Sequence, residues 1–284
     1  MIGKLPSFYG LGNRKMNESL ASCSNEHRCS FDVMQTDAYS LPRKFSEEQK
    51  EIMRKQVPAS DFKRIKLQEE LRKNWDKFYL RNKSNFFKDR WWIQHELGGL
   101  LEQHIDFQDN LNFLEAGCGV GNLVFPLMHL YPHWNFYAFD FSDKAIRLLR
   151  GRSEAHNFSI NTVVADLTSD RFSLDFPAAD IISLIFVLSA IPPCKQQQAV
   201  KNLLKLVKVR GMVFVRDYGI NDHAMLRFGR HCKLDERFYA KHDGTMTYYF
   251  KLEELDDLFI EQGFRKVKAH ISYEKLSTTK RSFS

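Results

Sequence analysis

The sequence predicts an α/β fold, in which helices cover both faces of a mostly parallel sheet. Two observations predict it. From residue 111 onward, short apolar runs alternate with longer helical patterns, as expected for parallel strands joined by helices. The first apolar run also leads directly into a glycine-rich turn, LEAGCGVGN at 114–122, and a helical pattern follows at once. We therefore expect a Rossmann-like domain over residues 111–274.

The elements of this domain can be placed in order. Strands are expected near 112–116, 134–140, 159–165, 180–187, 211–217 and 264–274. Helices are expected near 121–131, 142–156, 195–208 and 251–262. Residues 275–284 are polar and are interpreted as a C-terminal tail.

The N-terminal part of the chain has a different character. Residues 1–41 are rich in Ser, Asn and Gly without a sustained period and are expected to be disordered. Residues 42–110 are expected to form a helical module. Ser46 with Gln49 resembles a capping box, and Ser60 can cap a second helix on which Leu71, Trp75 and Tyr79 share one face.

Charge is concentrated in this module. Residues 43–92 carry 15 Lys and Arg against 8 Asp and Glu, which accounts for the net charge of +7 of the whole chain. Aromatic residues lie between the cations, a combination that suits RNA, because cations neutralise phosphates and rings stack on bases. A solvated amphipathic helix with core aromatics explains the same pattern, and charge alone does not separate the two.

Composition also narrows the function classes. The five cysteines are scattered and form no CxxC pair, so neither a disulfide framework nor a metal site is expected. The longest apolar stretch, 181–191, is far shorter than a membrane-spanning helix of about 20 residues. We expect a cytoplasmic protein, with the nucleus as a further compartment. The basic first 17 residues leave a mitochondrial presequence as an alternative.

The glycine-rich turn predicts a cofactor site. Its spacing is GxGxG (Gly117, Gly119, Gly121) and not the GxGxxG of dinucleotide-binding proteins, and Glu115 precedes it. An acid at that position would repel a pyrophosphate but suits the ammonium of S-adenosylmethionine. Asp140 ends the second strand, where a carboxylate can bind ribose hydroxyls. Asp166, followed by Leu167, ends the third strand and can contact an adenine.

Several motifs together resemble one family. They are LEAGCGVGN (114–122), FDFS (139–142), ADLT (165–168), LIFVLSAI (184–191), RDYGINDHAMLRF (216–228) and NWDKFYLRNKSNFFKDRWW (74–92). In this combination residues 43–274 resemble the tRNA 3-methylcytidine methyltransferases, a branch of the methyltransferase-like family, which implies the Rossmann-like fold of class I S-adenosylmethionine-dependent methyltransferases. The resemblance implies that the product is 3-methylcytidine in the anticodon loop of a subset of tRNAs, serine tRNAs among them. It also implies tRNA as partner, with seryl-tRNA synthetase as a presenting protein.

The resemblance also implies residue roles. Trp75 and Tyr79 would reach over the cofactor, and Gly117 with its neighbours would hold its methionine end. Asp140 would hold the ribose. Asp166 and Leu167 would bind the adenine, and Ile185 would line the pocket. The RNA-facing entrance would be formed by Phe87, Lys88, Asp89 and Arg90.

Two departures from the family stand out. KHDGTMTYYF at 241–250 stands where the family reads like RQDGTRSYFF, which weakens the expected RNA contacts there. The family also continues into a final strand, which we expect this chain to lack. We therefore expect a sheet with an exposed edge and lowered stability.

The chemistry needs little from the protein beyond positioning. Nitrogen 3 of cytosine already carries the attacking lone pair, and it is accessible only where the base is unpaired. A carboxylate would stabilise the cationic product, and Asp217, at the end of the fifth strand, is the first candidate. A structural role for Asp217, as a salt bridge with Arg216 or as a buried cap, is an equal alternative. His223 and Arg227 follow as candidates for orienting the base or holding phosphate.

Two other classes of function remain open from sequence. The same core could methylate a small molecule or a protein, with the basic module acting only as a lid. Alternatively, the chain could be a catalytically silent RNA-binding protein.

Overall fold

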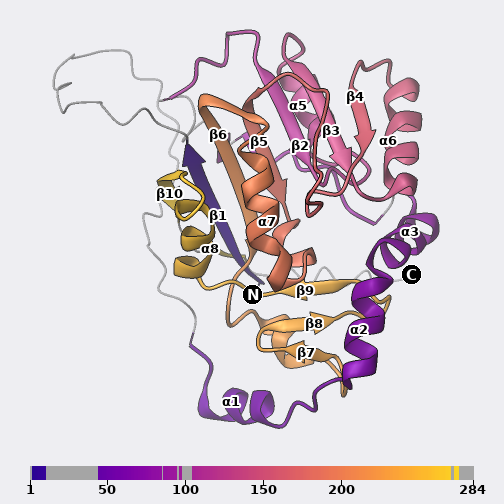
Figure 1. The fold of residues 1–284 in the computed structure, drawn as a ribbon, viewed down its shortest axis with the longest axis vertical. Helices are drawn as coiled ribbons and strands as arrows, with labels where there is room; N and C mark the ends of the chain where they lie inside the picture. The colour runs from indigo at the N-terminus through magenta and orange to yellow at the C-terminus, as the bar shows by residue number, and fades with distance from the viewer. Residues whose placement is uncertain are drawn as a thin grey trace, which may run out of the picture.

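The computed structural model describes residues 2–10, 44–84, 86–94, 96–97, 104–269 and 272–274, which form a central sheet flanked by helices and a second, smaller sheet (Figure 1). Five strands of the central sheet are parallel. They are β2 (Asn112–Ala116), β3 (Asn135–Asp140), β4 (Asn161–Val164), β5 (Ala179–Ile185) and β6 (Val207–Tyr218). The predicted α/β fold is confirmed.

Helices pack on both faces of this sheet. The helices α5 (Val124–Leu130) and α6 (Asp143–Ala155) share one hydrophobic cluster with Met212 and Phe214 of β6. On the other face, α7 (Pro193–Leu203) and α8 (Leu252–Ile260) share a second cluster with Val213 and Val215. Successive side chains of a strand point to opposite faces, so β6 is buried on both sides.

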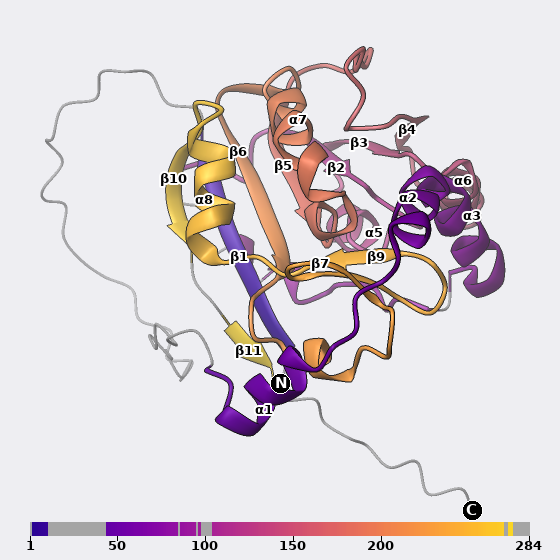
Figure 2. The ribbon, with the colours of Figure 1, turned by 60° about the horizontal axis from the view of Figure 1, so that its bottom comes forward.

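The edge beyond β6 differs from the expectation. The strand β1 (Ile2–Gly10) lies between β6 and β10 (Arg265–Ala269) and is antiparallel to both, and β11 (Ser272–Glu274) also pairs with β1 (Figure 2). The prediction of disorder was therefore wrong for residues 2–10. An exposed sheet edge was also expected, because a final strand was thought to be missing; beside β6, the structure has β1 instead. Residues 11–41 and 275–284, for which tails were expected, lie outside the described residues.

Two aromatic side chains anchor β1 in the core. Phe8 stacks on Phe214 with ring centroids 4.6 Å apart, and Tyr9 stacks on Phe259 at 3.9 Å. The Tyr9 hydroxyl donates to Asp256 Oδ1 at 3.0 Å. Both rings are completely or almost completely buried, on opposite faces of the sheet. The N-terminal strand is thus an integral part of the core.

The N-terminal module begins with three helices, α1 (Glu47–Arg54), α2 (Asp61–Glu69) and α3 (Leu71–Asn82). The predicted capping box of Ser46 and Gln49 is present, and the Ser60 side chain caps α2. The expected single helix after Ser60 is broken at Glu70, so α2 and α3 are separate helices.

A three-stranded antiparallel sheet lies at the carboxyl ends of the parallel strands (Figures 1 and 2). It consists of β7 (Lys233–Asp235), β8 (Phe238–Ala240) and β9 (Met246–Tyr248). A bridge between Pro58 and Lys233 joins it to the N-terminal module. The Asn74 amide of α3 also donates to the Gly244 carbonyl at 3.1 Å. This small sheet and α3 together enclose the end of the central sheet where the predicted site lies.

Among the described residues, no helix is long and apolar enough to cross a membrane. In the same part of the chain, no group of three or more His, Cys, Asp or Glu side chains is arranged to hold a metal ion. Cys118, Cys194 and Cys232 are free thiols.

Candidate active site

The glycine-rich turn after β2 forms the floor of the site. Gly117, Gly119 and Gly121 have φ values of 65°, 54° and 84°, a backbone region that favours glycine. A Cβ atom on Gly117 would lie 2.6 Å from Val187, and one on Gly119 would lie 2.8 Å from the Tyr79 hydroxyl. The loop therefore needs glycine both for its conformation and for the close approach of its neighbours.

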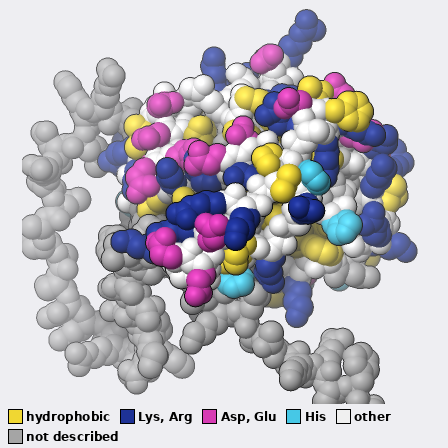
Figure 3. Space-filling view, turned by 90° about the horizontal axis from the view of Figure 1, so that it is seen from below, with side chains coloured by type: hydrophobic (Ala, Val, Ile, Leu, Met, Phe, Trp, Pro, Cys, Tyr) yellow, Lys and Arg dark blue, Asp and Glu magenta, His cyan; other side chains and the backbone are white. Residues whose placement is uncertain are grey.

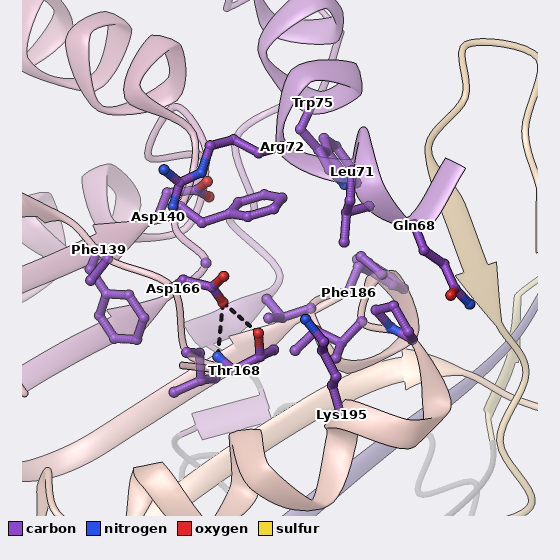
Figure 4. Close-up of a pocket in the computed structure, with 18 of the residues that line it drawn as sticks. Gln68, Leu71, Arg72, Trp75, Phe139, Asp140, Asp166, Thr168, Phe186 and Lys195 are labelled. Atoms are coloured by element: carbon purple, nitrogen blue, oxygen red, sulfur yellow. Dashed lines mark hydrogen bonds between the residues drawn. The ribbon is translucent and has the colours of Figure 1, made fainter. Parts of the chain in front are cut away.

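A cavity of about 370 Å³ opens beside this loop, within the size range of small-molecule sites (Figure 4). It lies between α3, the ends of β3 and β5, and the start of α7. Its walls are partly aromatic, and two of the carboxylates that line it, Asp140 and Asp166, lie at strand ends. The predicted site residues that line it are Trp75, Tyr79, Gly117, Asp140, Asp166 and Leu167.

The two carboxylates are held differently. Asp140 accepts from the backbone N–H groups of Gly119 and Ser142, both at 2.9 Å, and its burial raises its pKa to about 6. Asp166 is partly exposed and accepts from the N–H and hydroxyl of Thr168 (Figure 4). Asp140 is thus fixed by the glycine loop and by its own turn, and Asp166 by its own turn, while both line the cavity.

Helix α3 folds back over the glycine loop. Trp75 and Tyr79 contact each other, with ring centroids 5.8 Å apart, and both line the cavity. The Ser142 hydroxyl donates to Asp76 Oδ1 at 2.5 Å and ties the helix to the start of α6. The indole N–H of Trp75 is buried without a hydrogen-bond partner among the described residues. A buried donor without a partner is uncommon, and its position beside the cavity suits a ligand acceptor.

A second cavity, of about 300 Å³, adjoins the first. The two cavities share five of their lining residues: Trp75, Tyr79, Gly117, Phe186 and Ala190. Gly119 and Ile185, also predicted site residues, line only the second cavity. The two cavities therefore meet at the glycine loop, under the rings of α3.

Glu115 and Gly121 line neither cavity. Glu115 is buried below the loop, where Oε2 accepts from the N–H of Val124 at 3.1 Å. Burial raises its pKa to about 8. The structure thus places this acid where it shapes the glycine loop.

None of the predicted catalytic residues Asp217, His223 and Arg227 lines either cavity. The Asp217 carboxylate is fully buried and accepts from the N–H groups of Ser189 and Tyr218, each at 2.9 Å, and burial raises its pKa to about 6. It therefore braces the turn that carries Ser189. His223 is partly exposed and Arg227 is exposed, both on the short 3-10 helix η2 (His223–Arg227).

The segment expected at the RNA-facing entrance divides into two parts. Lys88 is exposed, and Phe87 lines the second cavity. Asp89, by contrast, pairs with Arg152 at 3.0 Å and accepts from the Asn122 amide at 3.0 Å, so it is a structural residue. Arg90 lines the second cavity beside the glycine loop.

The second cavity also contains residues for which sequence gave no site role. The Phe186 and Tyr218 rings are tilted toward each other with centroids 4.8 Å apart, and Lys241 Nζ lies 5.8 Å from the centroid of the Tyr218 ring. Asp243 completes this wall. Phe186 has a φ of 61°, an uncommon conformation for a non-glycine residue and one that clusters at functional sites. That backbone angle arises from the tertiary fold, and the sequence carried no signal for it.

These residues fit a nucleoside with an amino-acid tail. A loop open to close approach, two carboxylates at strand ends and an aromatic cover match the parts of S-adenosylmethionine, and a second cavity adjoins the first. The fold and site together define a class I, Rossmann-like S-adenosylmethionine-dependent methyltransferase.

Comparison with known proteins identifies the family. A family model described as a methyltransferase domain matches residues 114–213. The chain is 43% identical over 225 residues to human tRNA N(3)-cytidine methyltransferase METTL6, covering 78% of this chain and 79% of the relative. It is 37% identical over 212 residues to tRNA N(3)-methylcytidine methyltransferase trm141 of Schizosaccharomyces pombe, covering 72% and 84%. The chain belongs to the tRNA N(3)-cytidine methyltransferase family.

Solved structures show a more distant likeness. An S-adenosylmethionine-dependent methyltransferase from Clostridium acetobutylicum is 12% identical with a TM-score of 0.45, over 61% of this chain and 86% of that one.

Proposed function

We propose that this protein transfers a methyl group from S-adenosylmethionine to nitrogen 3 of a cytidine in the anticodon loop of a subset of tRNAs, serine tRNAs among them. The observation that carries the proposal is the second cavity, which meets the cofactor cavity at Gly117 under Trp75 and Tyr79. A flipped base in the second cavity would face a methyl donor in the first. The names of the related proteins supply the substrate class.

The lining of the second cavity suits a single base. Phe87, Phe186 and Tyr218 offer ring faces, on which an unstacked base can be received. Paired bases are not accessible to such a site, so a base in a loop is the expected substrate. An anticodon loop provides unpaired bases.

Bound S-adenosylmethionine would supply an electrophilic methyl group next to this cavity. The nucleophile is the lone pair of the base itself, so the protein needs to orient the ring and exclude water. Phe186 is held by a hydrogen bond from its N–H to the Arg216 carbonyl at 2.8 Å. Asp217 fixes the neighbouring turn through Ser189. We propose that these two hydrogen bonds, at Phe186 and at Asp217, hold the cavity wall in place.

The carboxylate that faces the cavity is Asp243. Its Oδ1 accepts from the N–H and hydroxyl of Thr245 at 2.9 and 2.7 Å, so the group is held in one orientation. Methylation leaves a positive charge on the cytosine ring, and a fixed carboxylate nearby stabilises that charge as it develops. We therefore propose Asp243 in the role that sequence assigned to Asp217.

The entrance suits a polyanion with exposed bases. Phe86 is 58% exposed and Trp91 is 52% exposed, and Lys88 lies between them in sequence. Lys and Arg side chains are spread among acidic ones over the face to which α1, α2 and the small sheet contribute (Figure 3). Some of these cations pair with acids, as Lys50 does with Glu47 at 2.6 Å, which leaves the unpaired ones for phosphate. We extend the proposal to seryl-tRNA synthetase as a presenting partner and to the cytoplasm as the main compartment, with the nucleus as a further one.

The decisive experiment is nucleoside mass spectrometry of tRNA incubated with the protein and isotope-labelled S-adenosylmethionine. The proposal expects labelled 3-methylcytidine, located in the anticodon loop by fragment analysis, and its loss when the target cytidine is replaced by uridine. Asp243→Asn should lower the rate of methylation at saturating cofactor without weakening cofactor binding. Label in peptides or metabolites but not in tRNA would overturn the proposal.

A further inference from the structure

Arg90 is a cation held at the wall of the second cavity, where none of the described acidic residues forms an ion pair with it. Its guanidinium makes no hydrogen bond or ion pair with any residue that the structure describes. Its carbon Cζ lies 5.7 Å from the centroid of the Phe186 ring. Burial lowers the pKa of the guanidinium, while the nearby Glu115 raises it. A desolvated cation without a partner is costly, so this position favours an anionic ligand.

The main chain of Arg90 is fixed to the glycine loop. Its N–H donates to the Asn122 carbonyl at 2.8 Å, at the end of the loop. The Asn122 side chain donates to Asp89 at 3.0 Å and to the Phe87 carbonyl at 3.0 Å. Arg152 holds Asp89 from the other side and donates to the Val120 carbonyl at 2.8 Å. Arg90 is therefore positioned relative to the backbone that faces the cofactor and not by a surface loop.

The neighbours of Arg90 indicate which anion it meets. Gly117, Cys118 and Gly119 line the same cavity, and this loop is the part of the fold that faces the amino-acid end of the cofactor. That end carries the only carboxylate of S-adenosylmethionine. Guanidinium and carboxylate form short, paired hydrogen bonds. An RNA phosphate is the competing anion, but Lys88 is the exposed cation of this segment, whereas Arg90 lines the cavity.

We propose that Arg90 binds the α-carboxylate of the methionine end of S-adenosylmethionine and thereby selects the intact cofactor over nucleosides that lack this tail. The segment 86–92 would then serve two ligands. Lys88 faces the RNA, and Arg90, two residues later, faces the cofactor. This assignment replaces the RNA contact that the sequence predicted for Arg90.

Isothermal titration with two ligands tests the assignment without tRNA. S-adenosylhomocysteine carries the amino-acid tail, and 5′-methylthioadenosine has the same nucleoside without it. Arg90→Gln should weaken S-adenosylhomocysteine binding at least tenfold and leave methylthioadenosine binding within about twofold, since a charged hydrogen bond is lost only with the first ligand. Arg90→Lys, which keeps the charge, should lie between Arg90→Gln and the wild type. Lys88→Ala is the matched control and should change neither affinity.

The unsubstituted protein provides a second measurement that does not depend on a variant folding. Converting the carboxylate of S-adenosylhomocysteine to a carboxamide should weaken its binding at least tenfold in the wild type and have little effect in Arg90→Gln. Equal losses for both nucleosides in Arg90→Gln would show a purely structural role and overturn the proposal. So would unchanged S-adenosylhomocysteine binding with weakened tRNA binding, which would assign Arg90 to phosphate. Because these ligands bind without RNA, the result stands whether or not tRNA is the substrate.

Discussion

Asp140 makes two kinds of contact that a substitution can separate. Its carboxylate accepts from the N–H of Gly119 and that of Ser142, and it also lines the cofactor cavity. We expect Asp140→Ala to weaken S-adenosylhomocysteine binding by about 1.5–3 kcal/mol, because a charged acceptor for the ribose is lost. Titration calorimetry measures this. Asp140→Asn keeps the size and one acceptor and should lose less. If a folded Asp140→Ala bound as tightly as the wild type, the ribose assignment would be wrong.

Trp75 tests whether α3 is a lid or only part of the core. The ring is partly exposed to both cavities, whereas the Tyr79 ring beneath it is buried. We expect Trp75→Ala to weaken cofactor binding while costing less stability than the about 3–5 kcal/mol of a fully buried aromatic truncation. Tyr79→Phe removes one hydroxyl and should have a small effect on both. Melting temperatures measured with and without S-adenosylhomocysteine distinguish a lid from a purely structural role of Trp75. A sharp drop in the ligand-free melting temperature, with an intact ligand-induced rise, would contradict the lid.

Glu115 makes stability depend on pH. Burial raises its pKa to about 8 in the folded protein, whereas the unfolded carboxyl releases its proton near the ordinary value of 4.5. The folded state therefore binds more protons between these values, so the free energy of unfolding should fall as pH rises from about 4.5 to about 8. One proton corresponds to at most about 1.4 kcal/mol per pH unit. Urea unfolding of the ligand-free protein across this range should show a flatter profile in Glu115→Gln. An unchanged profile would mean that other groups cause the dependence.

At the scale of elements, the N-terminal strand β1 should contribute strongly to stability. Tyr9 is fully buried, and its ring stacks on Phe259 while its hydroxyl donates to Asp256. We expect Tyr9→Ala to lower the free energy of unfolding by about 3–5 kcal/mol. Tyr9→Phe, which keeps the ring, should lose about 1 kcal/mol, because Asp256 remains paired with Lys266 at 2.6 Å.

The same strand borders the site, since Leu5 and Lys4 pair with Asp217 and Tyr218 of β6. Deleting residues 1–10 should therefore impair cofactor binding as well as stability, and a synthetic peptide of residues 1–10 should restore part of both. Urea unfolding and calorimetry measure the two effects. A Tyr9→Ala protein with wild-type stability would show that β1 does not occupy its place beside β6 in solution.

The elements that sequence predicted are those whose pattern is local. The strands near 112–116 and 134–140 and the helix near 142–156 were placed to within about two residues, because their apolar periodicity is visible in consecutive residues. β1 was missed because Gly3, Pro6 and Gly10 weaken the local strand signal, and its stability comes from pairing with distant strands. The strands of the small sheet are three residues each, too short to show alternation.

In the candidate site, too, sequence predicted the residues with a local signal and missed those brought together by the tertiary fold. The glycine loop, Asp140 and Asp166 were predicted because each follows a recognisable strand. Arg90, Lys241 and Asp243 reach the second cavity only through α3, the small sheet and the loops between them. No sequence spacing brings residues 90 and 243 together. Asp217 shows the opposite error, because a carboxylate at a strand end was expected to face the crevice but accepts from backbone N–H groups behind it.

At the scale of the whole molecule, the central sheet with its helices and the basic N-terminal module with the small sheet have different tasks. The sheet and its helices supply the cofactor floor, and the basic N-terminal module with the small sheet supplies the cover and the entrance. Asn74 and Gly244 connect α3 to the loop before β9 of the small sheet, and Asp76 and Ser142 connect it to the start of α6 on the central sheet. The module that is expected to meet RNA is thus the same element that covers the cofactor, which would couple the two binding events.

This arrangement predicts a strong salt dependence for tRNA binding. The net charge of +7 is carried by residues 43–92, and each phosphate contact releases counterions, so the logarithm of the association constant should fall linearly with the logarithm of salt concentration. Lys88→Ala should reduce the steepness of that line by roughly one, as expected for the loss of one phosphate contact. Lys201→Ala, on α7 and outside the basic module, is the control and should leave the slope unchanged. Fluorescence anisotropy with labelled tRNA from about 50 to 200 mM salt measures both. Equal slopes for Lys88→Ala and the wild type, or a reduced slope for Lys201→Ala, would place the RNA surface elsewhere on the protein.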